Sequence, residues 1–288
     1  MTDGPYSTCF FPHRHLVVHC TVIGLDIGAK YKVNKCNIFT GKRDPEDIQR
    51  QYYTETSSLY DEMHGSKDYE HYVALNYVAS FMDLLGISSV LDVGSGTGRA
   101  VKYLFEKGVK VQGIEPVIAL TNQAIQKNGI AAESLVCGIG EHLPFADNSY
   151  DAVCEFGILH HVQDPNAVVE EMIRVARKVI FLSDSNRFGQ GSKPSRWIKL
   201  LLYKMNLWGV ADLIKTRGRG YTISEVEGVA YSYSVFDSID LLAGWANRII
   251  LIPTRKEEFI SWLHPLLTAS HILPCAIREG SDVVDHSD

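Results

Sequence analysis

Residues 90–98, with the sequence VLDVGSGTG, hold the residue types best suited to binding a small ligand. Gly94, Gly96 and Gly98 follow a short apolar run, and Asp92 stands two residues before the first of them. Glycines let the backbone turn sharply and approach a ligand closely. A helix that begins after such a loop also offers unpaired N–H groups to an anion. The segment therefore predicts a ligand site between a strand and a helix.

The spacing of these glycines indicates whether the loop is of the dinucleotide-binding kind. Dinucleotide-binding proteins use the pattern G-x-G-x-x-G, which would place the third glycine at position 99. That position is Arg99, and the third glycine is Gly98. The spacing disfavours a nicotinamide or flavin oxidoreductase.

Glu115 supplies a second polar group at the same predicted site. It follows the next apolar segment, seventeen residues beyond Gly98, and precedes Pro116. A carboxylate at the end of the second strand of such a unit can accept hydrogen bonds from both hydroxyls of a ribose. The alternative is a solvated acid at a strand end. With the glycine loop in place, we favour the ribose interpretation.

His160 and His161 begin the loop after the fourth predicted strand. Histidine is the side chain whose pKa best suits a general base at neutral pH, which a hydroxyl acceptor would need. Adjacent residues face different ways, so we expect at most one of the two to be catalytic. The alternative for both is a structural or cofactor-packing role. His142 is a weaker candidate.

Strands and helices alternate from residue 89 onward, with glycines at the helix ends. This alternation predicts βαβ units and therefore an α/β fold, a doubly wound, Rossmann-like, mostly parallel seven-stranded sheet. Strands are expected at 89–93, 109–114, 133–137, 150–156, 178–184, 248–252 and 272–277. Helices are expected at 44–60, 69–85, 97–107, 117–128, 165–176, 236–245 and 256–267.

The chain is expected to divide into a main domain and two flanking segments. Residues 1–45 form an N-terminal extension, in which 16–25 and 31–39 are expected to pair as a hairpin around Gly28. Residues 46–278 form the main domain, and the acidic tail 279–288 is expected to be disordered.

Residues 185–234 interrupt the alternation and are interpreted as a substrate-recognition insertion after the fifth strand. A helix at 197–207 and a hairpin around 221–233 are expected there. Arginines mixed with aromatic residues suit a pocket for a small molecule, and they equally suit a dimer interface. Residues 198–207 are amphipathic and suited to touching a membrane, but we expect them to pack against the protein's own sheet.

Composition excludes several classes of function. The 288 residues carry a formal net charge of −6, and the densest basic stretch, 215–219, is short, so nucleic acid is not an expected partner. Six cysteines without a CxxC pair fit a reducing compartment, and we predict a cytoplasmic protein without stable membrane insertion. The spacing of His13, His15, His19 and Cys20 matches no common zinc site, so no metal is expected.

Four segments in order carry a family resemblance. They are VLDVGSGTG at 90–98, GIEP at 113–116, GIGEHLPF at 138–145 with YDAV at 150–153, and ILHHV at 158–162. Together they resemble the class I S-adenosylmethionine-dependent methyltransferases, in particular the small-molecule branch called methyltransferase type 11. The resemblance covers about residues 59–180.

The resemblance implies roles for individual residues, with S-adenosylmethionine as the cofactor. The glycine loop would approach the methionine part, Asp92 its ammonium group, Glu115 the ribose, and Glu155 and Phe156 the sulfonium and methyl group. Tyr60 would belong to a segment that closes over the cofactor, together with Tyr52 and Tyr53. The implied cofactor-binding set is Asp92, Gly94, Ser95, Gly96, Gly98, Glu115, Pro116, Ile139, Gly140, Glu141, Glu155, Phe156 and Tyr60.

One position departs from the family pattern. The family usually has an acid that contacts the adenine amino group where this chain has Ile139. An isoleucine cannot accept that hydrogen bond, so Ile139 is expected to pack on the adenine face. Glu141 or the backbone of Gly140 would then make the polar contact.

The resemblance implies a methyltransferase acting on a small molecule or on a glycan or lipid precursor, by in-line transfer to oxygen. Holding the reactants in line at about 3–3.5 Å can supply about 7–11 kcal/mol of the barrier. Three alternatives stay open: transfer to carbon or to nitrogen of a quinone-like acceptor, and a non-catalytic protein that binds the cofactor. The expected partner is a small-molecule acceptor, and the protein is expected to be a monomer or a homodimer.

Overall fold

The computed structural model describes residues 7–9, 18–20, 44–64, 69–225, 227–255 and 265–278. The chain forms two compact units, residues 1–42 and residues 43–288. In the first unit, β1 (Ser7–Cys9) pairs antiparallel with β2 (Val18–Cys20). The predicted partner segment 31–39 and the acidic tail 279–288 lie outside the described residues.

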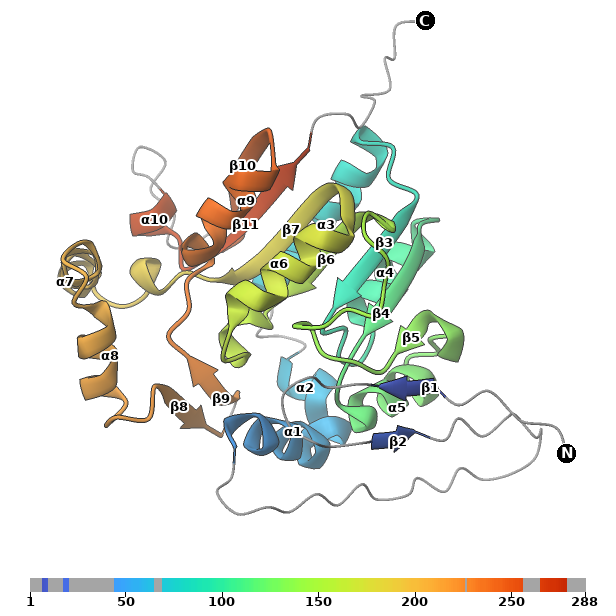
Figure 1. The fold of residues 1–288 in the computed structure, drawn as a ribbon, viewed down its shortest axis with the longest axis horizontal. Coiled ribbons are helices and arrows are strands. Elements are labelled where there is room, and N and C mark those ends of the chain that lie inside the picture. Colours follow the sequence, from blue (N-terminus) through green and yellow to red (C-terminus); the bar gives the residue numbers. More distant parts are fainter. Residues whose placement is uncertain are drawn as a thin grey trace, which may run out of the picture. The chain divides into compact units, whose positions relative to one another are not determined.

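A seven-stranded sheet forms the centre of the second unit, as predicted (Figure 1). Its strands stand in the spatial order β10-β11-β7-β6-β3-β4-β5, in which β11 runs antiparallel to both neighbours and the pairs from β7 to β5 are parallel. The strands are β3 (Ser89–Val93), β4 (Lys110–Ile114), β5 (Leu135–Val136), β6 (Tyr150–Phe156), β7 (Ala176–Ser185), β10 (Arg248–Pro253) and β11 (His271–Ile277).

The point where strand order reverses lies at β3, which pairs with β4 on one side and with β6 on the other. The register places Val93 opposite Ile114 and opposite Glu155. Ligands of open α/β sheets bind outside the carboxyl ends of the strands at such a reversal. The loops that follow β3, β4 and β6 therefore meet where a ligand is expected.

Helices cover both faces of the sheet, and the side chains of each strand alternate between them. Along β3, Val90 belongs to the core under α3 (Tyr69–Leu84) and α4 (Arg99–Glu106), whereas Leu91 belongs to the core under α6 (Pro165–Val175) and α9 (Ile239–Trp245). This alternation is the period of two expected for a strand buried on both faces.

Three further helices belong to this domain. They are α1 (Pro45–Thr56), α2 (Tyr60–His64) and α5 (Ile118–Gln126). The start of α1 follows from its sequence, because Asp44 is the N-cap, its carboxylate accepts a hydrogen bond from Glu46 N, and Pro45 occupies the first turn. The chain thereby enters the domain at a defined residue.

The insertion after β7 contains α7 (Lys193–Lys204), α8 (Trp208–Lys215), β8 (Tyr221–Ser224) and β9 (Gly228–Tyr231). The predicted hairpin is present, with Tyr221 opposite Tyr231. Helix α7 begins before the predicted residue 197, and α8 was not predicted. Neither helix contains a buried residue, so the prediction that residues 198–207 pack against the sheet was wrong. Among the described residues, no helix is long and apolar enough to cross a membrane.

Candidate functional site

The glycine loop joins β3 to α4 by a tight turn. The amides of Gly94 and Ser95 both donate to the carbonyl of Ile114, at 2.8 and 3.0 Å, which fixes the loop to the end of β4. Gly94 has a φ of 71° and Gly98 a φ of 77°, the left-handed region that favours glycine. A Cβ atom on Gly94 would lie 2.4 Å from Cγ2 of Ile158, so the loop also touches the segment after β6.

Glu115 is buried beneath this loop. Its Oε2 accepts a hydrogen bond from Gly96 N at 2.9 Å, and its Oε1 accepts one from Val117 N at 2.8 Å. Burial raises the pKa of Glu115 to about 7, although these two hydrogen bonds favour the ionised form. Each carboxylate oxygen keeps a second lone pair, so both can still accept from a ligand hydroxyl.

Asp92 is the second buried carboxylate, with 2% of its surface exposed. Burial raises the pKa of Asp92 to about 8, and the positive charge of Arg99 only partly offsets that rise. A buried carboxylate that lacks an adequate counter-charge favours a cationic ligand. Asp92 and Glu115 together therefore suit a ligand with a positive charge and hydroxyl groups.

Two buried oxygen atoms near the loop lack a hydrogen-bond partner among the described residues. They are Oγ of Ser95 and Oε1 of Glu155. Native proteins leave few buried polar atoms unpaired, and each exception needs an explanation. Unpaired oxygens beside two under-compensated carboxylates fit a ligand rich in hydrogen-bond donors.

Helices α2 and α3 cover the loop. Tyr60 of α2 and His71 of α3 line a small pocket with Asp92, Gly94 and Gly96. The pocket has a volume of about 30 Å³, which is roughly the share of one water molecule in the liquid. This pocket alone is therefore too small for a nucleoside.

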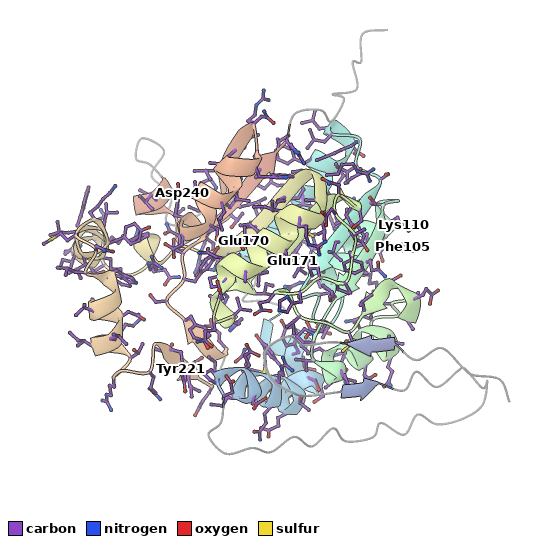
Figure 2. All side chains as sticks on the ribbon, in the orientation of Figure 1. Phe105, Lys110, Glu170, Glu171, Tyr221 and Asp240 are labelled. Carbon is purple, nitrogen blue, oxygen red and sulfur yellow. The ribbon has the colours of Figure 1, made fainter. Side chains whose placement is uncertain are left out.

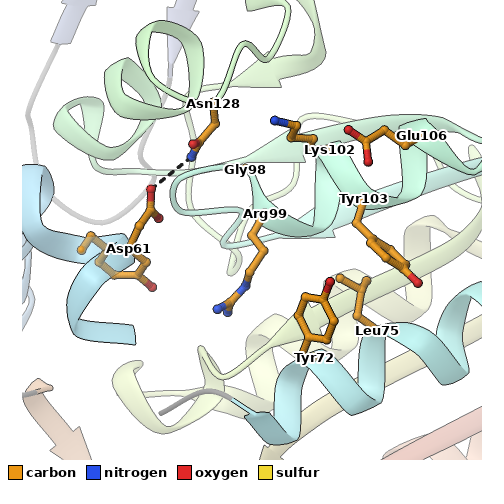
Figure 3. Close-up of a pocket in the computed structure, with 10 residues that line it drawn as sticks. Asp61, Tyr72, Leu75, Gly98, Arg99, Lys102, Tyr103, Glu106 and Asn128 are labelled. Atoms are coloured by element: carbon orange, nitrogen blue, oxygen red, sulfur yellow. Dashed lines mark hydrogen bonds between the residues drawn. The ribbon is translucent and has the colours of Figure 1, made fainter. Parts of the chain in front are cut away.

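Asp61 ties the cover to the loop. Its Oδ1 accepts a hydrogen bond from Oγ1 of Thr97 at 2.6 Å. Its Oδ2 accepts one from Nδ2 of Asn128 at 3.3 Å, which Figure 3 shows. An adjoining pocket of about 280 Å³ lies beside these residues and shares Tyr60 and Arg99 with the smaller one. Space for a larger ligand thus begins at the edge of the cover.

His160 forms a short contact with Asp184 at the end of β7. Nδ1 of the imidazole lies 2.7 Å from Oδ1 of Asp184, and the amides of Leu159 and His160 donate to Oδ2 at 2.9 and 3.3 Å. Burial opposes ionisation of Asp184, but the charge and hydrogen bond of His160 hold the pKa of this carboxyl well below its usual range. The ionised carboxylate therefore accepts Nδ1–H, which makes Nε2 the basic nitrogen.

His161 has different hydrogen-bond partners from His160, although the two rings do not face different ways as expected: their centroids lie 4.0 Å apart. Its Nδ1 lies 2.7 Å from the carbonyl oxygen of Val229 in β9, so it donates to the insertion. Its ring contacts Tyr53, and Tyr53 contacts Tyr60 edge to face, with ring centroids 5.9 and 5.8 Å apart. His161 therefore joins the cover to the insertion.

Sequence reasoning missed His71 and Asp184. Nδ1 of His71 lies 2.9 Å from Oγ of Ser183, and a Cβ on Gly157 would lie 2.8 Å from its Nε2. Asp184 ends the predicted fifth strand, and its place at the carboxyl end of a parallel strand was an available signal. His71 gave none, because which face of its helix meets the sheet is set by tertiary packing.

Glu155 and Phe156 end β6 at the same edge of the sheet. Phe156 lines the small pocket, and Glu155 is fully buried with Oε2 accepting from Ile158 N at 3.0 Å. Burial and the nearby charge of Asp184 raise the pKa of Glu155 well above its ordinary value. The surroundings of Glu155 thus oppose its ionisation.

The remaining candidates lie around the loop rather than in the small pocket. Gly140 approaches Val93 at the end of β3, since a Cβ there would lie 3.2 Å from Cγ1 of that valine. Ile139 and Pro116 are half-buried, and burial raises the pKa of the half-buried Glu141. Gly98 lines the larger pocket.

Known proteins resemble this chain in sequence. A family model described as a methyltransferase domain matches residues 91–180. A ubiquinone biosynthesis O-methyltransferase from Klebsiella pneumoniae is 30% identical over 208 residues, covering 69% of this chain and 76% of that protein. An uncharacterized methyltransferase from Mycolicibacterium gilvum is 36% identical over 89 residues, and that match spans 31% of this chain and 35% of the relative's length.

Solved structures share the fold. Magnesium protoporphyrin IX methyltransferase from Synechocystis aligns with a TM-score of 0.53 at 17% identity, covering 82% of this chain and 100% of that one. A possible histamine N-methyltransferase from Thermotoga maritima aligns with a TM-score of 0.52 at 16% identity, covering 80% and 100%. At these identities the likeness is one of fold.

Proposed function

Since this chain belongs to the class I S-adenosylmethionine-dependent methyltransferases, we propose that it transfers a methyl group to a hydroxyl oxygen of a small molecule, with His160 as the proton acceptor. The observation that carries the choice of oxygen is the contact between His160 and the buried Asp184.

The residues around the glycine loop fit the cofactor. Glu115 is positioned to accept the ribose hydroxyls, and Asp92 to pair with the methionine ammonium, whose charge would favour the ionised form of that carboxyl. Ser95, Gly94, Gly96 and Gly98 would surround the methionine part. Bound S-adenosylmethionine supplies an electrophilic methyl group on a sulfonium ion.

Around the adenosine, Pro116, Ile139, Gly140 and Glu141 keep the roles that the family pattern implies. Glu141 is the carboxyl best suited to the adenine amino group, because it is half-buried and lies in the loop after β5. Phe156 and Tyr60 line the small pocket and would exclude water from the reacting atoms. Glu155, which is fully buried, would lie next to Phe156.

Proton transfer follows from the arrangement of His160. Oδ1 of Asp184 accepts Nδ1–H, so the lone pair of Nε2 takes the proton of the acceptor hydroxyl as its oxygen attacks. The imidazolium that results is stabilised by the ionised Asp184 at 2.7 Å. His161 is less suited to this role, because its Nδ1 donates to the neutral carbonyl of Val229, which stabilises an imidazolium less than the carboxylate of Asp184 does.

The relative from Klebsiella pneumoniae supports an oxygen acceptor, because its name assigns O-methylation to that protein. We assign recognition of the acceptor to the insertion, residues 185–234, whose strand β9 reaches His161 through Val229. Its arginine and aromatic side chains suit a phenol-like or anionic small molecule.

Calorimetric titration with S-adenosylmethionine, S-adenosylhomocysteine and NADH is the first test. Saturable binding of the two adenosyl ligands and none of NADH is expected. An acceptor screen of catechols, phenols, amines and carboxylic acids then follows product mass by mass spectrometry. Absence of adenosyl binding at millimolar concentration contradicts the proposal.

His160→Gln tests the proton acceptor, with His142→Gln as a control at an exposed histidine. Loss of a general base lowers kcat by about 100-fold or more and leaves the affinity for S-adenosylmethionine unchanged. The low-pH decline of kcat should also disappear in His160→Gln. Full activity of this variant, or a preference for amine acceptors, which need no base once neutral, overturns the choice of oxygen.

A further inference from the structure

Side chains project from α7 and α8 at one side of the domain (Figure 2), and many of the exposed ones are apolar. Seven of these side chains are more than half exposed, and Ile214 reaches 75%. They are Trp197, Ile198, Leu201, Met205, Val210, Leu213 and Ile214. Single exposed apolar residues are ordinary, but a contiguous group of this kind marks an interaction surface.

The spacing of these residues places them in stripes. Trp197, Leu201 and Met205 follow one another at four-residue intervals along α7 and its C-cap, so they lie on one side of the helix. Val210 and Ile214 have the same relation on α8. Each helix therefore presents an apolar side, as helices at a membrane interface do.

Basic residues accompany the apolar ones. Residues 193–219 contain seven lysines and arginines and one acid, Asp212, in a chain whose formal net charge is −6. The basic residues are Lys193, Arg196, Lys199, Lys204, Lys215, Arg217 and Arg219. Of these, Lys193, Lys204, Lys215, Arg217 and Arg219 are exposed. This segment is thus net positive in an acidic chain, and it also carries the exposed apolar side chains.

The opposite side of the two helices is anchored to the domain. The Arg187 guanidinium stacks near the rings of Phe188, Tyr203 and Trp208, at 4.8, 5.4 and 5.2 Å from their centroids. It also forms a bidentate ion pair with Asp237 at 2.6 and 2.7 Å. Because these contacts fix one side of α7 and α8, the apolar side is held outward in the described part of the chain.

From this arrangement we propose that α7 and α8 dock on the surface of an anionic phospholipid bilayer. Apolar side chains at this surface would enter the boundary between headgroups and acyl chains, and the basic side chains would pair with lipid phosphates. A second copy of this chain is the less favoured occupant. A two-fold interface would place the same net positive patch against itself, where like charges repel.

Vesicle co-sedimentation of the full chain tests the proposal. Vesicles of phosphatidylglycerol and phosphatidylcholine in equal amounts should bind the protein, and vesicles of phosphatidylcholine alone should bind it about tenfold less. Binding should weaken as NaCl is raised, since salt screens exposed charges. No binding to the anionic vesicles, or equal binding to both compositions, overturns the proposal.

Two variants identify the surface. Leu201→Ser with Ile214→Ser removes apolar contacts, and Lys204→Glu with Arg217→Glu reverses two exposed charges. Each pair should lower binding to the anionic vesicles about tenfold or more. All four side chains are exposed, so circular dichroism should show the wild-type fold.

Matched controls lie on α3, α4 and the start of β4. Leu84→Ser with Phe105→Ser removes two equally exposed apolar side chains, and Lys107→Glu with Lys110→Glu makes the same change in net charge (Figure 2). Neither control should change vesicle binding. If the controls lower binding as much as the α7–α8 variants do, attraction is due to overall charge or hydrophobicity and the proposal fails.

Sedimentation velocity distinguishes the second occupant. The proposal expects the same sedimentation coefficient for the wild type and for Leu201→Ser with Ile214→Ser. A wild-type dimer that this variant converts to a monomer would identify the surface as an interface between copies, and would overturn docking on lipid.

Discussion

The glycine loop and the α7–α8 helices leave opposite kinds of group in an unfavourable environment. Around the loop, the carboxylates of Asp92 and Glu115 are buried without enough positive charge. On α7 and α8, apolar side chains such as Leu201 and Ile214 remain in water. Both arrangements cost free energy in the isolated chain. A bound ligand would relieve each cost. Buried charge therefore identifies the first region as a binding site, and exposed apolar surface identifies the second.

Phe188→Ala should give the largest effect on stability, because it removes a buried ring that packs against α7. Phe188 is 1% exposed and its ring packs edge to face on Tyr203 at 5.1 Å. Loss of a buried phenylalanine costs about 3–5 kcal/mol of stability. Urea denaturation should show this, whereas Ile214→Ser should change the free energy of unfolding by less than about 0.5 kcal/mol. An equal cost for Ile214→Ser would mean that its side chain is covered in solution.

Glu115→Ala should give the second largest effect, which is measured on ligand binding. The change removes the acceptor of the Gly96 and Val117 amides and of the proposed ribose hydroxyls. The Kd for S-adenosylmethionine should rise about 100-fold, or ~2.7 kcal/mol, by calorimetry. Glu133→Ala, at an exposed glutamate, is the control and should bind normally. Normal binding by Glu115→Ala would show that this carboxylate does not contact the ligand.

Asp92→Asn and Asp151→Asn form a matched pair with opposite expected signs. Burial raises the pKa of Asp92 to about 8, so its folded-state cost grows as pH rises from about 4 to about 8. Asp92→Asn should therefore raise the Tm at pH 8 and leave it unchanged at pH 4. The expected gain is about 1–2 kcal/mol.

Asp151 is equally buried, but its carboxylate accepts two hydrogen bonds from Ser88 and pairs with Arg177. Despite the opposing effect of burial, these partners lower the pKa of Asp151, so its contribution is present above about pH 4 and is lost as pH falls further. Asp151→Asn should lower the Tm at pH 8 by the equivalent of about 1 kcal/mol. Thermal scans at both pH values check the pair. If both substitutions changed the Tm at pH 8 in the same direction, the two carboxyls would not differ electrostatically as proposed.

The parallel sheet was predictable because its signals are local. The strands β3 and β6 begin and end at the predicted residues 89–93 and 150–156, since each apolar run is bounded by polar or glycine residues. The strand order at β3 also places the glycine loop beside Ile114, as expected for this fold. Local patterns therefore sufficed for the scaffold and for the loop.

Contacts between distant segments were not predictable from such patterns. The approach of His71 to Gly157 depends on how α3 packs against the sheet, which residue spacing alone does not determine. Helix α8 was missed because its first turn contains Gly209 and no side chain caps it. The exposure of α7 was also missed, since an amphipathic pattern does not state what covers its apolar side.

The side chain of Gln49 has a consequence for motion. Its Nε2 donates to the carbonyl of Glu227 at 3.0 Å, its Oε1 accepts from Val229 N, and Gly228 lies against it, where a Cβ would meet that oxygen. Helix α1 therefore cannot shift without breaking both hydrogen bonds or carrying β9 with it. Tyr53 of α1 packs on Tyr60 of α2, so α1 is joined to the cover. If opening of the cover admits the cofactor, the position of the insertion and the occupancy of the loop become thermodynamically linked, and any such coupling acts equally in both directions.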